Sequence, residues 1–183
     1  SRGSHIIMKF TKTRFQDLKI IESEKKSDAR GYFKRIFDMG EFSKKKLETK
    51  FVQLSFSHNK KKGTLRGMHF QKKPFQETKI VQCVKGKIFD VVIDLRPNSS
   101  TYKKWFSLEL SESDSKMLYI PKGFAHGFLT LENNTEVFYQ ISTNYNPKYV
   151  GRIRWDDEEF KIRWPIKPVI ISKNDLITKS FKK

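Results

Sequence analysis

The chain has 183 residues, with 38 Lys and Arg against 20 Asp and Glu, and its formal net charge is +18 at pH 7. This length suits one domain, and the single cysteine, Cys83, excludes a framework of intramolecular disulfides. No apolar run approaches the ~20 residues of a membrane-spanning helix, so we expect a soluble, cytoplasmic protein.

The positive charge raises the hypothesis of nucleic-acid binding, because clustered Lys and Arg neutralise phosphates. The lysines, however, form short runs such as 44–46, 60–62 and 182–183, and there is no zinc-finger spacing or RNP-type motif. A lysine-rich surface that steers a small phosphorylated substrate explains the charge equally well. We therefore expect neither a nucleic-acid partner nor a membrane partner.

The first residues, SRGSHII (1–7), resemble the remnant of an expression tag, so the folded domain is expected over 8–183 and His5 is set aside. A short helix is possible at 38–48 and one helical turn at 111–116. From about residue 51, short strands alternate with turn signals, which favours a sandwich or barrel. The expected fold class is a single all-β domain.

The segment LRGMHFQ (65–71) places a histidine in a strand-like run. The two-residue period of a strand puts Leu65, Gly67, His69 and Gln71 on one side and Arg66, Met68 and Phe70 on the other. His69 could be a catalytic base or a hydrogen-bonded structural residue. Taken alone, the segment favours the structural role.

The clearest pair of strands is KIVQCVKGKIFDVVIDL (79–95), in which Lys85 and Gly86 predict a tight hairpin turn. Asp90 and Asp94 share an otherwise apolar face of the second strand, so these carboxylates are either paired in a polar pocket or exposed. Cys83, between apolar neighbours, is expected to be a buried, inert thiol. Further strands are expected at 104–110, 116–121, 125–131 and 136–143.

Several kinds of catalytic site can be set aside. His58, His69 and His126 are isolated from one another, so the ligand pattern of a metal cupin is absent and no metal is expected. There is no nucleophile elbow and no Gly-rich phosphate loop. Acid–base chemistry is what is left, with His69, Lys79, His126 and Tyr139 as candidates, although each alone also fits a structural role.

Five ordered segments resemble the dTDP-4-dehydrorhamnose 3,5-epimerase family: LRGMHFQ, KIVQCVKGKIFDVVIDLR, IPKGFAHGF, FYQISTNYNP and WDDEEFKIRWP. The resemblance runs from about Arg30 to Asp175. It implies a cupin-type jelly-roll barrel with short peripheral helices, a nucleotide-sugar substrate, no metal and no cofactor. It also implies a homodimer in which an exchanged N-terminal strand helps to build the neighbouring site.

The resemblance also assigns roles to individual residues. It implies that His69 is the base, that Asp175 orients it, that Tyr139 is the proton donor on the opposite sugar face, and that Lys79 stabilises the enolate oxygen. The implied substrate-binding residues are Arg66 and His126 on the diphosphate side, with Gln53, Tyr145, Arg30, Phe33, Arg35 and Ser55.

The chemistry of an epimerase needs groups of these kinds. A ketone at C4 of a sugar acidifies the hydrogens at C3 and C5, because either carbanion is delocalised onto O4 as an enolate. Inversion then requires a base and an acid on opposite walls of a pocket. A histidine suits the base because its unperturbed pKa is ~6.5, a carboxylate fixes its tautomer, and a lysine ammonium stabilises the negative charge on O4. The predicted function is an epimerase that inverts C3 and C5 of a nucleoside-diphosphate 4-keto-6-deoxysugar, in deoxysugar or surface-polysaccharide biosynthesis.

Two positions depart from the family pattern. The stretch DxRGxFxE is DARGYFKR here, so Arg35 replaces an acidic residue of the base-recognition region, and Ser55 replaces an expected asparagine. Arginine can only donate, and its fork matches the O6 and N7 acceptors of guanine. A GDP-linked 4-keto-6-deoxyheptose is therefore an alternative substrate. Inversion at C3 alone, and a non-catalytic cupin that binds a nucleotide sugar, are two further alternatives.

Overall fold

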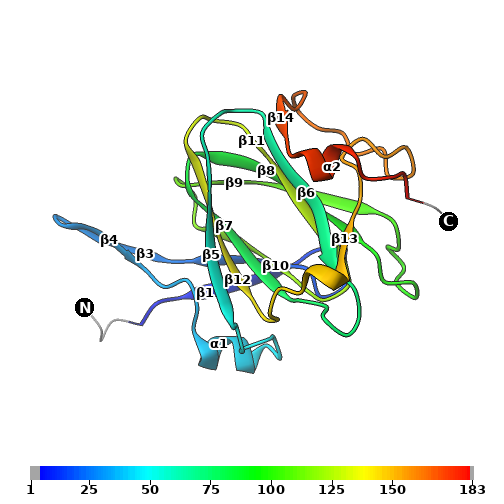
Figure 1. The fold of residues 1–183 in the computed structure, drawn as a ribbon. Helices are drawn as coiled ribbons and strands as arrows, with labels where there is room; N and C mark the ends of the chain where they lie inside the picture. Colours follow the sequence, from blue (N-terminus) through cyan, green and yellow to red (C-terminus); the bar gives the residue numbers. More distant parts are fainter. Residues whose placement is uncertain (1–4, 182–183) are drawn as a thin grey trace.

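The computed structural model describes residues 5–181, which form two facing six-stranded sheets (Figure 1). The first sheet contains, in spatial order, β1 (Met8–Lys12), β2 (Lys19–Ser23), β10 (Lys116–Ile120), β7 (Lys79–Lys85), β12 (Thr135–Ile141) and β5 (Gln53–Asn59). The second sheet contains β13 (Val150–Arg152), β6 (Thr64–Gln71), β11 (Phe124–Thr130), β8 (Lys87–Asp94) and β9 (Trp105–Ser111), and β14 (Ile170–Ile171) runs parallel to β6.

From β5 to β12 the chain crosses between the sheets at nearly every connection, and only β8 and β9 are consecutive neighbours in one sheet. This is the connectivity of a jelly roll, as expected. The four later strands predicted at 104–110, 116–121, 125–131 and 136–143 correspond to β9, β10, β11 and β12.

Three apolar clusters hold the sheets and their coverings together. The cluster between the sheets contains Val81, Val92 and Phe128, all at most 1% exposed. The outer face of the first sheet packs against Phe42 of the short helix α1 (Met39–Lys44), which confirms the helix predicted within 38–48. The outer face of the second sheet is covered by the C-terminal segment through Ile153 and Phe160.

The prediction of a hairpin at Lys85 and Gly86 is wrong. Strand β7 pairs with β10 and β12, whereas β8 pairs with β9 and β11, so the two strands belong to opposite sheets. Gly86 has a φ of 77°, and a Cβ there would collide with Thr135. A glycine at positive φ serves a hairpin or a corner between sheets equally well, so the local signal did not distinguish them.

The prediction of a helical turn at 111–116 is also wrong. This segment is the turn between β9 and β10, in which the carboxylate of Asp114 accepts hydrogen bonds from the backbone N–H groups of Ser111 and Lys116. An aspartate that bonds to nearby backbone groups competes with helix formation. Two other short helical elements follow later in the chain, a 3₁₀ turn at Pro147–Tyr149 and α2 (Lys173–Leu176).

The two aspartates of β8 both lie inside the molecule. The carboxylate of Asp94 accepts hydrogen bonds from Arg96 Nε at 2.9 Å and from the hydroxyls of Ser99 and Thr101 at 2.6 Å each. Asp90 contacts His126 instead, at 2.6 Å. Of the two alternatives, pairing inside the molecule rather than exposure at the surface is therefore correct for both carboxylates. On β7, burial raises the pKa of the Cys83 thiol to about 12, so this thiol stays protonated at neutral pH.

The N-terminal part of the chain extends along the barrel and then away from it. Of the segment assigned to a tag remnant, residues 1–4 lie outside the described residues, whereas Ile6 is 4% exposed. Strands β3 (Lys25–Asp28) and β4 (Gly31–Lys34) form a separate hairpin that projects from the barrel (Figure 1). No helix within 5–181 is long and apolar enough to cross a membrane.

Candidate active site

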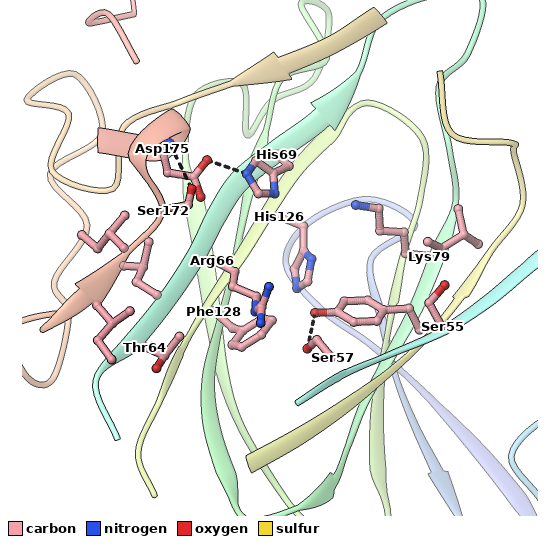
Figure 2. Close-up of a pocket in the computed structure, with 15 residues that line it drawn as sticks. Ser55, Ser57, Thr64, Arg66, His69, Lys79, His126, Phe128, Ser172 and Asp175 are labelled. Atoms are coloured by element: carbon pink, nitrogen blue, oxygen red, sulfur yellow. Dashed lines mark hydrogen bonds and ion pairs between the residues drawn. The ribbon is translucent and has the colours of Figure 1, made fainter. Parts of the chain in front are cut away.

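A cavity of about 530 Å³ opens between the two sheets (Figure 2). It brings together residues that are widely separated in the sequence, from β5, β6, β7, β11, β12 and the segment from β14 to α2. Of the predicted site residues, the cavity is lined by His69, Lys79, Tyr139, Asp175, Arg66, His126 and Ser55.

His69 and Asp175 form a dyad on one wall. His69 Nε2 lies 2.7 Å from Asp175 Oδ1, although 106 residues separate them. Asp175 is held in place because its N–H donates to Ser172 Oγ, the N-cap of α2, and because its Oδ2 accepts from Gly67 N–H. With the Nε2 proton on the carboxylate side, Nδ1 is the nitrogen left to act as a base.

The carboxylate of Asp175 is adapted to stay ionised. Burial acts to raise its pKa, but the hydrogen bond and charge of His69, followed by the bonds from Gly67 and Ser172, lower the pKa below its ordinary value. Arg152 Nε, 3.5 Å from Oδ1, adds a second cation. The carboxylate can therefore fix the imidazole and stabilise the imidazolium that forms when His69 takes a proton.

Arg66 and His69 share the cavity, contrary to the strict alternation expected along 65–71. Strand β6 pairs with β11 so that His69 lies opposite His126 and Arg66 lies opposite Phe128. Three steps along β6 thus match two steps along β11, which is a β-bulge at Gly67 and Met68. The bulge turns the strand by one residue, so Arg66 and His69 face the same side.

A second histidine–aspartate pair lies deeper in the cavity. His126 Nε2 is 2.6 Å from Asp90 Oδ1, and their side chains are 5% and 0% exposed. The other oxygen of Asp90 has no hydrogen-bond partner within the described part of the chain. The ring of His126 also packs edge-on against Tyr139, with centroids 6.3 Å apart.

Tyr139 and Lys79 belong to the opposite wall. They lie on adjacent strands, where Ile141 of β12 pairs with Lys79 of β7, so both side chains face the cavity from the first sheet. Lys79 Nζ is 2.9 Å from Glu77 Oε1. Burial raises the pKa of Tyr139, which keeps its hydroxyl protonated at neutral pH. The cavity therefore holds a candidate base on one wall and a candidate acid on the other.

The other predicted residues lie outside this cavity. Gln53 and Tyr145 are joined by a 2.9 Å hydrogen bond from Tyr145 N–H to Gln53 Oε1. Arg30 and Phe33 are on the projecting hairpin, where Phe33 is 41% exposed. Arg35 follows this hairpin and lies 3.8 Å from Asp38. A single copy of the chain thus brings together only part of the expected site.

Several site residues were not anticipated from the sequence. Ser57 lines the cavity two residues after Ser55, and the strand period could have identified it. Asn59 accepts a hydrogen bond from Arg66, and Glu77 forms an ion pair with Lys79. No periodicity in the sequence indicates either of these two contacts. No group of three or more His, Cys, Asp or Glu within 5–181 is arranged to hold a metal ion.

In sequence, the chain is similar to one family of known proteins over most of its length. A family model described as dTDP-4-dehydrorhamnose 3,5-epimerase matches residues 12–183. The chain is 42% identical to the dTDP-4-dehydrorhamnose 3,5-epimerase of Methanothermobacter thermautotrophicus over 170 residues, which is 91% of each chain.

Solved structures agree in fold over nearly the whole chain. The dTDP-4-dehydrorhamnose 3,5-epimerase of Bacillus anthracis, solved with TDP and PPi bound, is 37% identical, with a TM-score of 0.92 over 96% of this chain and all of that one. The dTDP-6-deoxy-D-glucose-3,5-epimerase of Legionella pneumophila, solved with dTDP-4-keto-L-rhamnose, is 34% identical, with a TM-score of 0.90 over 95% of this chain and 93% of that one.

Proposed function

Since the chain belongs to the dTDP-4-dehydrorhamnose 3,5-epimerase family, we propose that it inverts C3 and C5 of a nucleoside-diphosphate 4-keto-6-deoxysugar in deoxysugar biosynthesis. The observation that carries this proposal is the pairing of the His69–Asp175 dyad with Tyr139 across one cavity. A binding protein without catalysis needs neither an acid nor a base, so this arrangement favours an isomerase.

The reaction follows from the positions of three side chains. His69 Nδ1 removes the proton from C3 or C5, and Asp175 stabilises the imidazolium. The electron pair moves into the C4 ketone, and the Lys79 ammonium on the facing wall stabilises the resulting enolate oxygen. Tyr139 then returns a proton to the opposite face of the same carbon, which inverts it.

Arg66 is the residue that we assign to the diphosphate. Its side chain is exposed at the cavity and is oriented by a 2.7 Å hydrogen bond from Nε to Asn59 Oδ1. Its guanidinium donors suit phosphate oxygens. His126 was expected on the same side, but its burial against Asp90 favours a place beside the sugar instead.

The nucleotide is proposed to be dTDP, with GDP as the alternative. The matched relatives are named for dTDP sugars, and the Bacillus anthracis structure contains TDP. Arg35 supports the alternative, because its guanidinium can donate to guanine but cannot accept from a base. Arg35 lies over the ring of Phe33 at 5.9 Å, a position from which both residues could contact one base.

One experiment tests the reaction and the nucleotide together. The enzyme is incubated with dTDP- and GDP-linked 4-keto-6-deoxysugars in heavy water, and deuterium at C3 and C5 is counted by NMR. We expect label and inversion at both carbons with the dTDP sugar. Label at C3 alone would identify a 3-epimerase, preference for the GDP sugar would identify the alternative nucleotide, and no label with either would overturn the proposal.

We further propose a homodimer in which the N-terminal hairpin of one protomer completes the site of the other. Arg30, Phe33 and Arg35 lie outside the cavity of their own protomer, and the hairpin projects from the barrel (Figure 1). The outer face of the edge strand β5 is apolar, since Leu54 and Phe56 are 62% and 68% exposed. Such a face is suited to a second copy of the chain.

We expect Phe56→Asp to shift the protein from dimer to monomer, because it places a charge in the middle of this apolar face. The measurement is molar mass by sedimentation or light scattering. Val169→Asp is the matched control, since Val169 is 70% exposed and lies next to β14 of the other sheet. A Phe56→Asp protein that keeps the mass of the wild type would contradict this interface.

A further inference from the structure

A chain of hydrogen bonds connects Arg66 to the hydroxyl of Tyr139. Arg66 Nε donates to Asn59 Oδ1 at 2.7 Å. Asn59 Nδ2 lies 3.4 Å from Ser57 Oγ and 3.1 Å from the carbonyl oxygen of Thr135. Ser57 Oγ lies 3.2 Å from Tyr139 Oη, a contact that Figure 2 draws as the dashed line at Ser57.

The direction of these bonds is set at the Arg66 end. A guanidinium can only donate, so the atom of Asn59 that faces Arg66 must be its oxygen. The amide nitrogen of Asn59 then points the other way. It lies 3.1 Å from the Thr135 carbonyl oxygen and 3.4 Å from both Ser57 Oγ and the Ser57 carbonyl oxygen, so one hydrogen is donated to Thr135 and the other is shared by the two oxygens of Ser57. Asn59 is 2% exposed, so water does not compete freely for these bonds.

This direction decides where the hydroxyl protons lie. When Ser57 Oγ accepts from Asn59, its own hydrogen is free to be donated to Tyr139 Oη. Tyr139 Oη is then an acceptor in this contact, and its own proton can point into the cavity. A tyrosine that donated its proton to Ser57 would have none directed at a substrate carbon.

The same contact matters after proton transfer. A tyrosine that protonates a carbanion becomes a tyrosinate, and burial in the cavity disfavours that charge, as the raised pKa of Tyr139 indicates. The hydrogen bond with Ser57 and the charge of Arg66 act in the opposite direction, whereas Asp90 adds to the effect of burial. A hydroxyl that already donates to Oη stabilises the tyrosinate without reorganisation.

We propose that Ser57 and Asn59 are positioning residues that direct the proton of Tyr139 into the cavity and stabilise the tyrosinate formed on its release. This inference rests on the proposed function, in which Tyr139 is the proton donor. It predicts a specific defect. Proton removal by His69 continues without Ser57, but protonation from the opposite wall slows.

Ser57→Ala tests this defect with the 4-keto sugar substrate in heavy water. We expect deuterium exchange at the sugar to persist, while inversion at the carbon that Tyr139 protonates falls about 10- to 100-fold, the range for a hydrogen bond to a charged group. Ser57→Thr keeps a hydroxyl and should restore most of the inversion. Ser107→Ala, a serine on β9 outside the cavity, is the control.

Asn59→Asp tests the direction of the chain with almost no change in shape. A carboxylate at this position still accepts from Arg66 but cannot donate to Ser57, so Ser57 would donate to it and draw the Tyr139 proton out of the cavity. We expect a loss of inversion similar to that of Ser57→Ala. Thermal unfolding of each variant is measured alongside, so that a loss of folding is recognised.

A double-mutant cycle with Tyr139→Phe completes the test. If Ser57 acts through Tyr139, Ser57→Ala should cause little further loss in the Tyr139→Phe protein. Wild-type inversion in Ser57→Ala, equal loss of exchange and inversion, or additive effects in the cycle would overturn the inference. A wild-type enzyme that exchanges no hydrogen would instead overturn the proposed function.

Discussion

His69→Ala should lower both hydrogen exchange and epimerisation by about 10²- to 10⁴-fold, the usual contribution of a positioned general base. The imidazole of His69 is held by Asp175 through Nε2, which leaves Nδ1 to accept a proton, and alanine removes this group and leaves Asp175 facing an empty space. Exchange from C3 and C5 is followed by NMR in heavy water, and product is measured separately.

Nucleotide binding is the control for His69→Ala. Other residues are assigned to bind the nucleobase and the diphosphate of the substrate. The shift in melting temperature caused by dTDP should therefore be nearly unchanged. Unchanged turnover would remove His69 from the mechanism. Loss of exchange together with loss of nucleotide binding would indicate a collapsed cavity rather than a missing base.

Asp175→Asn should lower turnover by up to about 10⁴-fold, by analogy with the same exchange in a catalytic triad. An asparagine can offer its amide hydrogens to His69 Nε2, which would move the imidazole proton to Nδ1 and remove the free base. Asp17→Asn, an exposed carboxylate outside the cavity, is the control. Turnover within a few-fold of the wild type would mean that the tautomer of His69 is fixed by another group.

The contribution of Asp175 to the stability of the folded protein depends on pH. The pKa of Asp175 is lowered in the folded protein, so its contribution to stability is complete above its ordinary value of 3.8 and is lost as the pH falls through the lowered value. The difference in melting temperature between wild type and Asp175→Asn should therefore shrink as the pH falls from 5 to 3, where the carboxylate becomes protonated. A difference that stays the same over this range would contradict an ionised Asp175 in the folded protein.

The strands were predictable because their signal is local. Short strand-like runs between turn signals identified β9 to β12 within one or two residues of their observed ends, since both signals come from neighbouring residues. The connection at Gly86 was not predictable in the same way. Whether β8 returns beside β7 or crosses to the other sheet depends on which distant strands pair with each, here β10 and β12 against β9 and β11.

The bulge in β6 shows the same limit at the site itself. The sequence of 65–71 predicts that Arg66 and His69 face opposite sides, but pairing with β11 inserts one extra residue and places both in the cavity. The place of Asp90 was likewise open, because its partner His126 comes from another strand, whereas Asp94 is bonded by the loop that directly follows it, from Arg96 to Thr101.

The all-β class, the positions of most strands and the acid–base candidates follow from the amino-acid sequence, because residue type and turn signals are local properties. The family resemblance added the pairing of Asp175 with His69, and the 2.7 Å contact across 106 residues gives that pairing its geometry. The contact of Tyr139 with Ser57 and the place of Arg35 outside the cavity came from the folded structure, because contacts between distant segments are set by sheet pairing, bulges and packing rather than by any local pattern.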